Sequence, residues 1–388
     1  MNISQEVEKI QEELVLLRQK FHQYPETALQ EKITTRMIRE ELEKDGIAYD
    51  RVDPTGVVAY LGNGTGKTVA LRADIDGLLV VEETGLCFAS VNPGKMHACG
   101  HDGHIAGLLG AAKVLKKFES GLNGRIKLIF QPAEENSSGA KAVIDQGYLN
   151  DVKEIFGLHI FSDLPSGCVS IEGGPRMAAT DHFSITITGK SGHAAKPHQC
   201  VDATVAAAAL VMNLQTILSR RLDPLDDAVL TIGRLQSGTA YNIISGEAVL
   251  EGTVRTFSVE TEHKIKEMII QISNDTAHLY GAKAKVDYPG SMHPPLINDA
   301  QIAKRIYRKA ESVFAPEQLI TVPKIMLGED FANYQTKVPG VFAFVGGGKT
   351  DGSENFPNHH SKFDFTDEAL ISAVKLHLTY VESIFGVL

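Results

Sequence analysis

Residues 126–135 read Ile-Lys-Leu-Ile-Phe-Gln-Pro-Ala-Glu-Glu, an apolar run that ends in a proline and two adjacent glutamates. The run 126–130 is typical of a buried strand, and helical patterns flank it along the chain. Further apolar runs lie at 69–71, 155–159 and 341–345, with helical patterns at 3–21, 33–42, 105–115, 140–144, 300–313 and 368–385. Strands that alternate with helices predict an α/β domain with a central, mostly parallel sheet flanked by helices.

The middle of the chain carries a second pattern. Its strands are expected at 183–188, 228–235, 248–256 and 282–288, and its helices at 202–218 and 261–280, with Asp202 as a candidate N-cap. The order β-α-β-β-α-β is that of a ferredoxin-like α+β domain. We therefore expect residues 181–291 to form a small domain inserted into the α/β domain, which comprises residues 1–180 and 292–388.

The composition narrows the class of protein. The 388 residues are too many for one typical core, which agrees with two domains. A net charge of −10 argues against binding to nucleic acid or to an anionic membrane, because phosphate groups would be repelled. No apolar run reaches the ~20 residues that span a bilayer, and the N-terminal segment does not resemble a signal peptide. Four cysteines do not make a disulfide framework, so a cytoplasmic location is expected.

Residues 97–104 read His-Ala-Cys-Gly-His-Asp-Gly-His and form the densest cluster of metal-binding side chains in the sequence. Thiolate, imidazole and carboxylate groups are the ligands that Zn²⁺ and related divalent ions select. The alternative is a polar turn whose histidines cap the following helix, and that explanation would suffice for a single His-X-His pair. Three histidines with Cys99 and Asp102 in eight positions favour a metal site.

Further ligand types follow other predicted strands, at the sheet edge where open α/β folds bind their ligands. Glu134 and Glu135 come after the run 126–130, and one of them can ligate an ion while its neighbour holds a water. His159 ends another strand, and the histidines at 359–360 lie in a loop after a third. Each is by itself consistent with a structural or solvated side chain. Together with the cysteine-containing cluster they supply enough ligands for two ions.

Two further features have both a structural and a chemical interpretation. Asp74 and Asp76 follow the run 69–71, and they are either a charged turn or carboxylates that orient ligating imidazoles. The glycine-rich loop 189–198 contains His193, and it is either a plain connection or a donor to a substrate oxyanion.

These segments together resemble the M20 metallopeptidase family over nearly the whole chain, and within it the amidohydrolases of N-acyl amino acids, which include hippurate and indole-acetyl-amino-acid hydrolases. The resemblance rests on short motifs at 21–26, 72–76, 97–102, 131–135, 192–195, 252–255 and 328–331. The cysteine-containing motif is specific to the amidohydrolase subgroup, since many M20 peptidases have an aspartate there. One departure is Asp74, which stands where many M20 peptidases have a ligating histidine, and His101 is expected to replace it.

The resemblance implies two divalent ions per subunit, Mn²⁺ or Zn²⁺ with Co²⁺ or Ni²⁺ as alternatives. The implied ligands are Cys99, His101, Glu135, His159 and His359. Glu134 is expected to be the general base and Asp76 a supporting carboxylate, and His193 is expected to stabilise the oxyanion in the site of a partner subunit. Asn242 and Arg255 are expected to contact the substrate. The inserted domain is then the lid and the dimerisation domain of a homodimer.

The implied reaction is hydrolysis of the amide bond of an N-acyl amino acid, such as an N-acetyl amino acid, by a hydroxide that bridges the two ions. His359 is preferred to His360 because its spacing to Phe363 fits the family pattern. Two alternatives stay open, namely a dipeptidase or carboxypeptidase on the same scaffold and a non-catalytic protein that binds metal or amino acids. A second glutamate beside a ligand favours an enzyme, because a binding protein has no need of it. The sequence does not determine the acyl group, the amino acid or the native metal.

Overall fold

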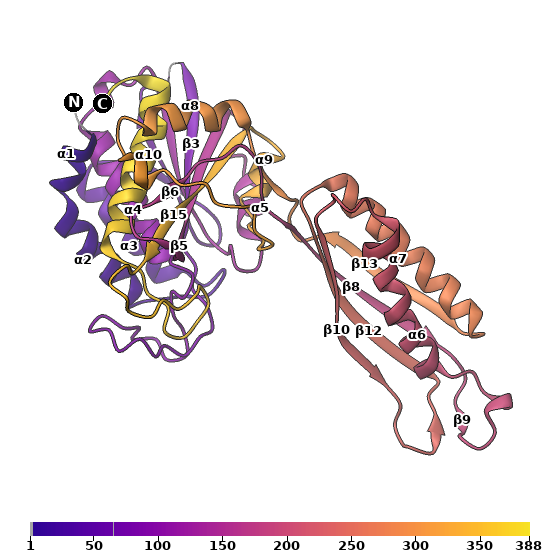
Figure 1. Cartoon of the computed structure of the whole chain (residues 1–388). Coiled ribbons are helices and arrows are strands. Elements are labelled where there is room, and N and C mark those ends of the chain that lie inside the picture. The colour runs from indigo at the N-terminus through magenta and orange to yellow at the C-terminus, as the bar shows by residue number, and fades with distance from the viewer. Residues whose placement is uncertain (1–2, 65) are drawn as a thin grey trace. The chain divides into compact units, whose positions relative to one another are not determined.

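The computed structural model describes residues 3–64 and 66–388, and the chain separates into two compact units. The large unit comprises Met1–Arg176, Ile297–Pro323 and Asp330–Leu388, and the small unit comprises Met177–Leu296 and Lys324–Glu329 (Figure 1). The small unit contains all of the predicted insert 181–291. It also contains the segment Lys324–Glu329, which comes from a later part of the chain.

A seven-stranded sheet forms the middle of the large unit, in the order β1-β2-β4-β3-β5-β15-β6. The strands are β1 (Ala48–Arg51), β2 (Val57–Gly62), β3 (Lys67–Asp74), β4 (Gly124–Gln131), β5 (Val152–Pro165), β6 (Val169–Ser170) and β15 (Gly340–Gly348). The central strands β4, β3, β5 and β15 pair in parallel, whereas β1, β2 and β6 make antiparallel pairs at the two sides. The predicted α/β class with a mostly parallel sheet is confirmed.

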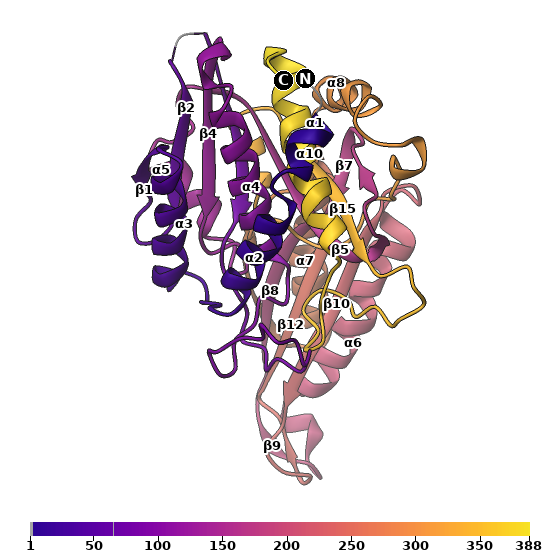
Figure 2. The same ribbon diagram turned by 90° about the vertical axis from the view of Figure 1, so that its left-hand side faces the viewer.

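Helices flank this sheet. They are α1 (Ile3–Glu8), α2 (Gln11–His22), α3 (Lys32–Lys44), α4 (His101–Lys116), α5 (Gly139–Asp145), α8 (Ala300–Ala310), α9 (Ala332–Gln335) and α10 (Asp367–Phe385). Helices α2, α4 and α10 pack against one another on one face (Figure 2). Helix α4 is buried almost all round. A Cβ at Gly103 would lie 2.5 Å from Cζ of Phe365, so this face of α4 needs a glycine for close packing.

The single opening helix predicted at 3–21 is wrong, because the structure divides it into α1 and α2. Ile10 leaves the helical region with φ −114° and ψ 5°, and its N–H donates to the carbonyl oxygen of Val7 in a tight turn. Val7, Ile10 and Leu14 are all buried. The apolar spacing therefore continues across the break, and for that reason the pattern could not reveal it.

The small unit has the predicted β-α-β-β-α-β order, and its ferredoxin-like class is confirmed. Its elements are β8 (Ala179–Thr188), α6 (Ala203–Thr216), β10 (Ala228–Ser237), β12 (Glu247–Thr256), α7 (Val259–Leu279) and β13 (Lys283–Ser291). The four strands pair antiparallel in the order β10-β12-β8-β13, and α6 and α7 share one apolar core with them. The side chain of Asp202 accepts from the N–H groups of Thr204 and Val205, as expected of the N-cap of α6.

Short elements complete the chain, namely η1 (Glu119–Gly121), β7 (Gly174–Met177), β9 (Gly192–His193), η2 (Pro197–Gln199), η3 (Ile217–Arg221), β11 (Ile243–Ile244), β14 (Leu296–Asn298) and η4 (Pro316–Gln318). Within residues 3–64 and 66–388, no helix combines the length and the apolar character needed to cross a membrane.

Candidate metal centre

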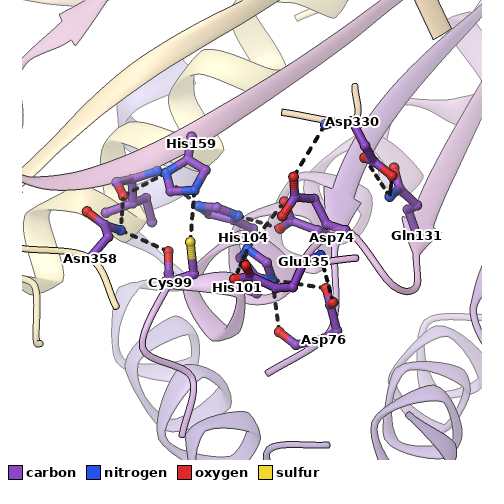
Figure 3. A network of polar contacts seen from close by, with 12 residues as sticks. Asp74, Asp76, Cys99, His101, His104, Gln131, Glu135, His159, Asp330 and Asn358 are labelled. Carbon is purple, nitrogen blue, oxygen red and sulfur yellow. Dashed lines mark hydrogen bonds and ion pairs between the residues drawn. The ribbon is translucent and has the colours of Figure 1, made fainter. Parts of the chain in front are cut away.

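The proposed ligands of the large unit gather where the central strands end. Asp74 and Gln131 are the last residues of β3 and β4, and they face each other in the register of the two strands. His159 lies inside β5, which continues to Pro165, so the prediction that it ends its strand is wrong. Cys99 and His101 lie at the start of α4, where Gly100 adopts a left-handed φ of +89°. Figure 3 shows these side chains and Glu135 close together.

Cys99 is the centre of this arrangement. Its Sγ lies 3.3 Å from Nε2 of His159 and 3.3 Å from Nε2 of His359. Oε1 of Glu135 lies 3.5 Å from Nε2 of His359 and 3.9 Å from Nε2 of His101. The donor atoms form two overlapping groups, Cys99-His101-His159 and Cys99-Glu135-His359, each within 4.8 Å. All five expected ligands are thus brought together, and Cys99 belongs to both groups.

The two buried histidines present a ring nitrogen to this space. Nδ1 of His101 lies 2.8 Å from the carbonyl oxygen of Asp76, and Nδ1 of His159 lies 2.9 Å from that of Ile160. A carbonyl can only accept, so each Nδ1 carries a proton, and in the neutral ring each Nε2 keeps its lone pair. Metal-binding histidines commonly donate their second N–H to a carbonyl in this way. Both rings are therefore oriented to ligate through Nε2.

The structure also tests whether these residues fit a metal. Among the described residues, Nε2 of His101 and Oε1 of Glu135 are buried and make no hydrogen bond. A buried polar atom without a partner costs about 1–3 kcal/mol, so such atoms are usually paired with protein, water or an ion. The donor set of thiol, imidazoles and carboxylate suits a borderline divalent ion. The site therefore fits the divalent metals that the sequence predicted.

The electrostatics of the site favour a cation. Burial raises the pKa of the Cys99 thiol well above its usual value, and the carboxylates of Glu135, Glu134 and Asp74 raise it further. Burial alone would lower the pKa of His101, but nearby carboxylates, chiefly those of Asp74 and Asp76, raise it to about 10. In both cases neighbouring carboxylates contribute to the shift, and a bound cation would offset their negative charge.

Asp74 and His104 are hydrogen-bond partners. Nδ1 of His104 lies 2.5 Å from Oδ1 of Asp74, and Nε2 of His104 accepts from the N–H of Ile160 at 2.9 Å. The other oxygen of Asp74 accepts from Arg72 at 2.7 Å. Burial tends to raise the pKa of Asp74, but Arg72 and the two histidines outweigh it and hold the pKa well below the usual value. Asp74 is thus engaged by protein groups, and with His101 and His104 it also forms a group whose donor atoms lie within 4.8 Å of one another.

The expected base and its supporting carboxylate lie beside the ligands. A carboxylate oxygen of Glu134 lies within 4.8 Å of donor atoms of His101 and Glu135, and its Oε1 accepts from the N–H of Asp330 at 3.3 Å. Asp76 accepts from the N–H of Glu135 at 3.0 Å, and its Oδ1 lies 3.3 Å from Nδ1 of His101.

The histidines at 359–360 have different surroundings. His359 has a φ of +71°, and its N–H donates to the carbonyl oxygen of Ala98 at 2.7 Å, beside Cys99. His360 instead stacks on Phe356, with ring centroids 4.7 Å apart. Asn358 ties this loop to the centre, because its side-chain amide donates to the carbonyl oxygens of Cys99 and Ile160. Of the two histidines, His359 is the one whose ring nitrogen lies at the cluster.

Sequence reasoning missed a buried network behind the site. Arg72 is completely buried and donates to Asp74, Asp330 and Gln131 at 2.7–2.9 Å. Asp330 also accepts from Gln131 and from the N–H of Ala140, where α5 begins. Burial raises the pKa of Asp330 to about 6 against the opposing effect of Arg72. The motifs 72–76 and 328–331 were the available signal, but neither spacing indicates that the two segments meet.

The three expected residues of the small unit do not all lie together. His193 pairs with Ile243 in the ribbon of β9 and β11, and the carbonyl oxygen of Asn242 accepts from the N–H of Ala194 at 3.1 Å. Nδ1 of His193 accepts from the N–H of Ala195 at 3.0 Å, which leaves Nε2 as the donor. Arg255 pairs with Thr180 near the far end of β12, roughly 25 Å along the strand from its start at 3.3 Å per residue.

Comparisons with known proteins agree with the motifs. The profile of the peptidase family M20/M25/M40 matches residues 70–383. An N-acetyl-L-cysteine deacetylase of Bacillus subtilis (strain 168) is 41% identical over 369 residues, which cover 94% of this chain and 86% of that protein. The IAA-amino acid hydrolase ILR1-like 4 of Arabidopsis thaliana is 38% identical, with 94% and 84% covered.

A solved structure is similar over its full length. The YXEP protein of Bacillus subtilis, described as a dinuclear metal-binding peptidase from the M20 family, is 36% identical with a TM-score of 0.85. The match covers 98% of this chain and 100% of that one. By sequence motifs, profile and structure, this chain belongs to the M20/M25/M40 family of peptidases.

Proposed function

We propose that this protein hydrolyses the amide bond of N-acyl amino acids and that N-acetyl amino acids are among its substrates. Its family makes it a metal-dependent hydrolase of amide bonds. The finer proposal is supported by its relatives, which are named as a deacetylase of N-acetyl-L-cysteine and a hydrolase of IAA-amino acids. The observation that carries it is the convergence of five ligand side chains from four separate segments, with Glu134 beside them.

We assign two divalent ions per subunit to one set of ligands, with Mn²⁺ or Zn²⁺ as the first choice and Co²⁺ or Ni²⁺ as alternatives. The assigned ligands are Cys99, His101, Glu135, His159 and His359. When bound, such ions polarise a carbonyl group and lower the pKa of water to about 7. Asp76 supports this set, because it accepts the N–H of Glu135 and lies against His101.

We assign the proton transfers to Glu134. Its carboxylate lies next to His101 and Glu135, is half-buried, and is held on one side by the N–H of Asp330. In this position it takes a proton from the attacking water and returns it to the leaving amine. The shuttle requires a carboxylate that is not itself consumed as a ligand, and the adjacent Glu135 fills that other role.

The small unit supplies the substrate contacts in this proposal. His193 is assigned as the oxyanion donor because its Nδ1 is occupied by the N–H of Ala195 and its Nε2 therefore carries a proton. Asn242, which directly precedes β11, and Arg255 are assigned to the substrate, with Arg255 suited to a carboxylate. We propose that His193 acts in the site of a partner subunit of a homodimer.

The base assignment is tested with Glu134→Gln, which keeps the shape and the hydrogen-bond acceptor but removes the basicity. Metal content should match that of the unchanged protein, whereas kcat should fall by roughly 10²–10⁴-fold. Glu134→Asp is the matched control, since it keeps a basic group on a shorter side chain and should retain more activity than the glutamine variant. Near-normal turnover of Glu134→Gln would refute the role of Glu134.

The substrate class is tested with a panel of N-acetyl, N-benzoyl and indole-acetyl amino acids beside dipeptides, each with Mn²⁺, Zn²⁺, Co²⁺ or Ni²⁺ added to metal-free protein. Metal-dependent release of acid from acyl amino acids supports the proposal. Cleavage of dipeptides alone would favour the peptidase alternative, and binding without any cleavage would favour a non-catalytic protein.

The partner-subunit role is tested by mixing two inactive variants, His193→Ala and Glu134→Ala. If each site uses the base of one subunit and the donor of the other, mixed dimers contain one intact site and recover activity. Absence of recovery, with dimers demonstrated by sedimentation, would contradict the role across subunits.

A further inference from the structure

Glu31 is a buried carboxylate that the sequence did not single out. It is fully excluded from solvent and lies just before α3. Its Oε2 accepts from the hydroxyl of Thr55 at 2.7 Å, and its Oε1 accepts from the N–H of Ala133 at 2.8 Å. The second bond reaches across 102 positions of the chain to the residue directly before Glu134.

Ala133 has an unusual backbone conformation. Its φ is +52°, in the left-handed region that residues with a Cβ adopt at an energetic cost, and the residue is fully buried. The carbonyl oxygen of Ala133 accepts from the N–H groups of Ser138 and Gly139, which closes a turn between β4 and α5. The turn carries Glu134 and Glu135, so the conformation at Ala133 sets the direction in which both side chains leave β4.

Neighbouring residues confine the turn on the same side. A Cβ at Gly56 would lie 2.8 Å from Cδ of Pro132 and 2.8 Å from the carbonyl oxygen of Phe130, so this segment packs directly on the end of β4. The N–H of Gly56 donates to the hydroxyl of Thr35, at the start of α3. The region around Glu31 and Thr55 thus packs against the turn and restricts its position.

The turn is held by carboxylates on both sides of Glu134. Glu31 accepts the N–H of Ala133, and Asp76 accepts the N–H of Glu135 at 3.0 Å. Asp76 also contacts His101 and belongs to the proposed site, whereas Glu31 accepts from Thr55 and Ala133, neither of which is an assigned ligand. The two amides that flank Glu134 are therefore fixed independently, and hydrogen bonds to charged acceptors are the strong ones.

We propose that Glu31 is a positioning residue, which holds Ala133 in its left-handed conformation and so aims the carboxylate of Glu134 at the water that it deprotonates. This inference rests on the proposed function, because it takes Glu134 to be the base. Glu31 does not touch the substrate and acts through the turn alone. A displacement of about 1 Å at a reacting group can lower a rate by about 100-fold, so a firm hold on this turn has a direct consequence for turnover.

The main test compares Glu31→Ala with Glu31→Gln in the metal-loaded enzyme on an N-acetyl amino acid. Alanine leaves the buried N–H of Ala133 without its acceptor, and kcat should fall roughly 10- to 100-fold while KM changes by less than about 3-fold. Glutamine still offers a carbonyl oxygen to Ala133, and its amide can donate to Thr55, so most of kcat should return. If alanine and glutamine are equally poor, or if both are fully active, the proposal is overturned.

A double-mutant cycle tests the link to the backbone conformation. Glycine adopts a positive φ without the cost that alanine has. The loss of kcat caused by Glu31→Ala should therefore be several-fold smaller in an Ala133→Gly background than in the unchanged protein. Equal losses in the two backgrounds would show that Glu31 acts by some route other than Ala133.

Glu26→Ala is the matched control. Glu26 is a buried carboxylate of the same segment, and it accepts from the N–H groups of Ile33 and Thr34 at the start of α3. Its loss should lower stability but leave kcat of the folded protein unchanged. If Glu26→Ala lowers kcat as much as Glu31→Ala, the effect is general destabilisation and the proposal fails. If Glu31→Ala does not fold, Glu31→Asp replaces it, because it keeps the charge and withdraws the oxygen from Ala133.

Hydrogen exchange separates this inference from the proposed function. The amides of residues 133–139 should exchange at least about 10-fold faster in Glu31→Ala than in the unchanged protein, and Glu31→Gln should restore protection. This measurement needs no substrate, so it tests the hold on the turn even if no N-acyl amino acid is cleaved. Unchanged exchange in Glu31→Ala would overturn the positioning role.

Discussion

His22 is buried in a charged cluster, and its protonation should make the stability of the protein depend on pH. Its Nδ1 lies 2.9 Å from Oδ2 of Asp102, and its Nε2 lies 3.2 Å from Oε1 of Glu82. Arg18 donates to the same oxygen of Asp102 at 3.1 Å. Burial alone would lower the pKa of His22, but Asp102 and Glu82 outweigh both burial and Arg18 and raise it from 6.5 to about 9.

The contribution of His22 to the free energy of unfolding follows from the difference between its pKa values in the folded and unfolded states. At 1.36 kcal/mol for each pH unit, a pKa of about 9 in the folded protein against 6.5 in the unfolded chain corresponds to about 3 kcal/mol. Because the folded pKa is the higher one, the folded state binds the proton more tightly. The stabilisation is therefore complete below pH 6.5 and is lost as the pH rises from 6.5 through about 9.

The assay is urea unfolding of the unchanged protein and of His22→Gln between pH 6 and pH 9.5, with the same saturating metal in both. Groups that titrate in both proteins cancel in the difference between their free energies of unfolding. The unchanged protein should be the more stable one at pH 6, and its advantage should shrink by about 3 kcal/mol by pH 9.5. A difference that stays constant over this range would refute the raised pKa and the buried charged pair on which it depends.

Three further predictions concern the metal centre, the network behind it and the packing of α4. Cys99→Ala should weaken the binding of Co²⁺ to the metal-free protein by more than the roughly 10- to 100-fold that is typical of residues that only support ligands. Competition with a chelator measures this affinity, and an unchanged affinity would exclude a ligand role for Cys99. Arg72→Met leaves two buried carboxylates without their cation and should lower the free energy of unfolding by about 3–5 kcal/mol, whereas a loss below about 1 kcal/mol would contradict the network. Gly103→Ala should lower the free energy of unfolding by about 1–3 kcal/mol, measured by thermal or urea unfolding, because the added methyl group overpacks against Phe365. Gly233→Ala is the control, because the space around its Cβ position is open and no overpacking is expected.

Much of the fold could be predicted because its signals are local. The alternation of apolar runs and helical patterns indicated the strands of the central sheet except β1, β2 and β6, and the order β-α-β-β-α-β indicated the ferredoxin-like unit. Asp202 was recognised as an N-cap because the cap bonds lie within three residues. The break between α1 and α2 was missed, since the buried positions keep a helical spacing through the turn at Ile10.

The metal centre likewise has features that the sequence predicts and features that only the structure shows. The sequence by itself determined which residue types were available, because cysteine, histidine and glutamate after strand ends are recognisable as ligands without coordinates, and the family motifs named their positions. Only the tertiary structure decided that Cys99 lies between His159 and His359, that Arg72 meets Asp330, and that Glu31 reaches Ala133. These contacts join residues 60 to 260 positions apart. Their distances depend on how strands and helices pack, and spacing along the chain carries no information about that packing.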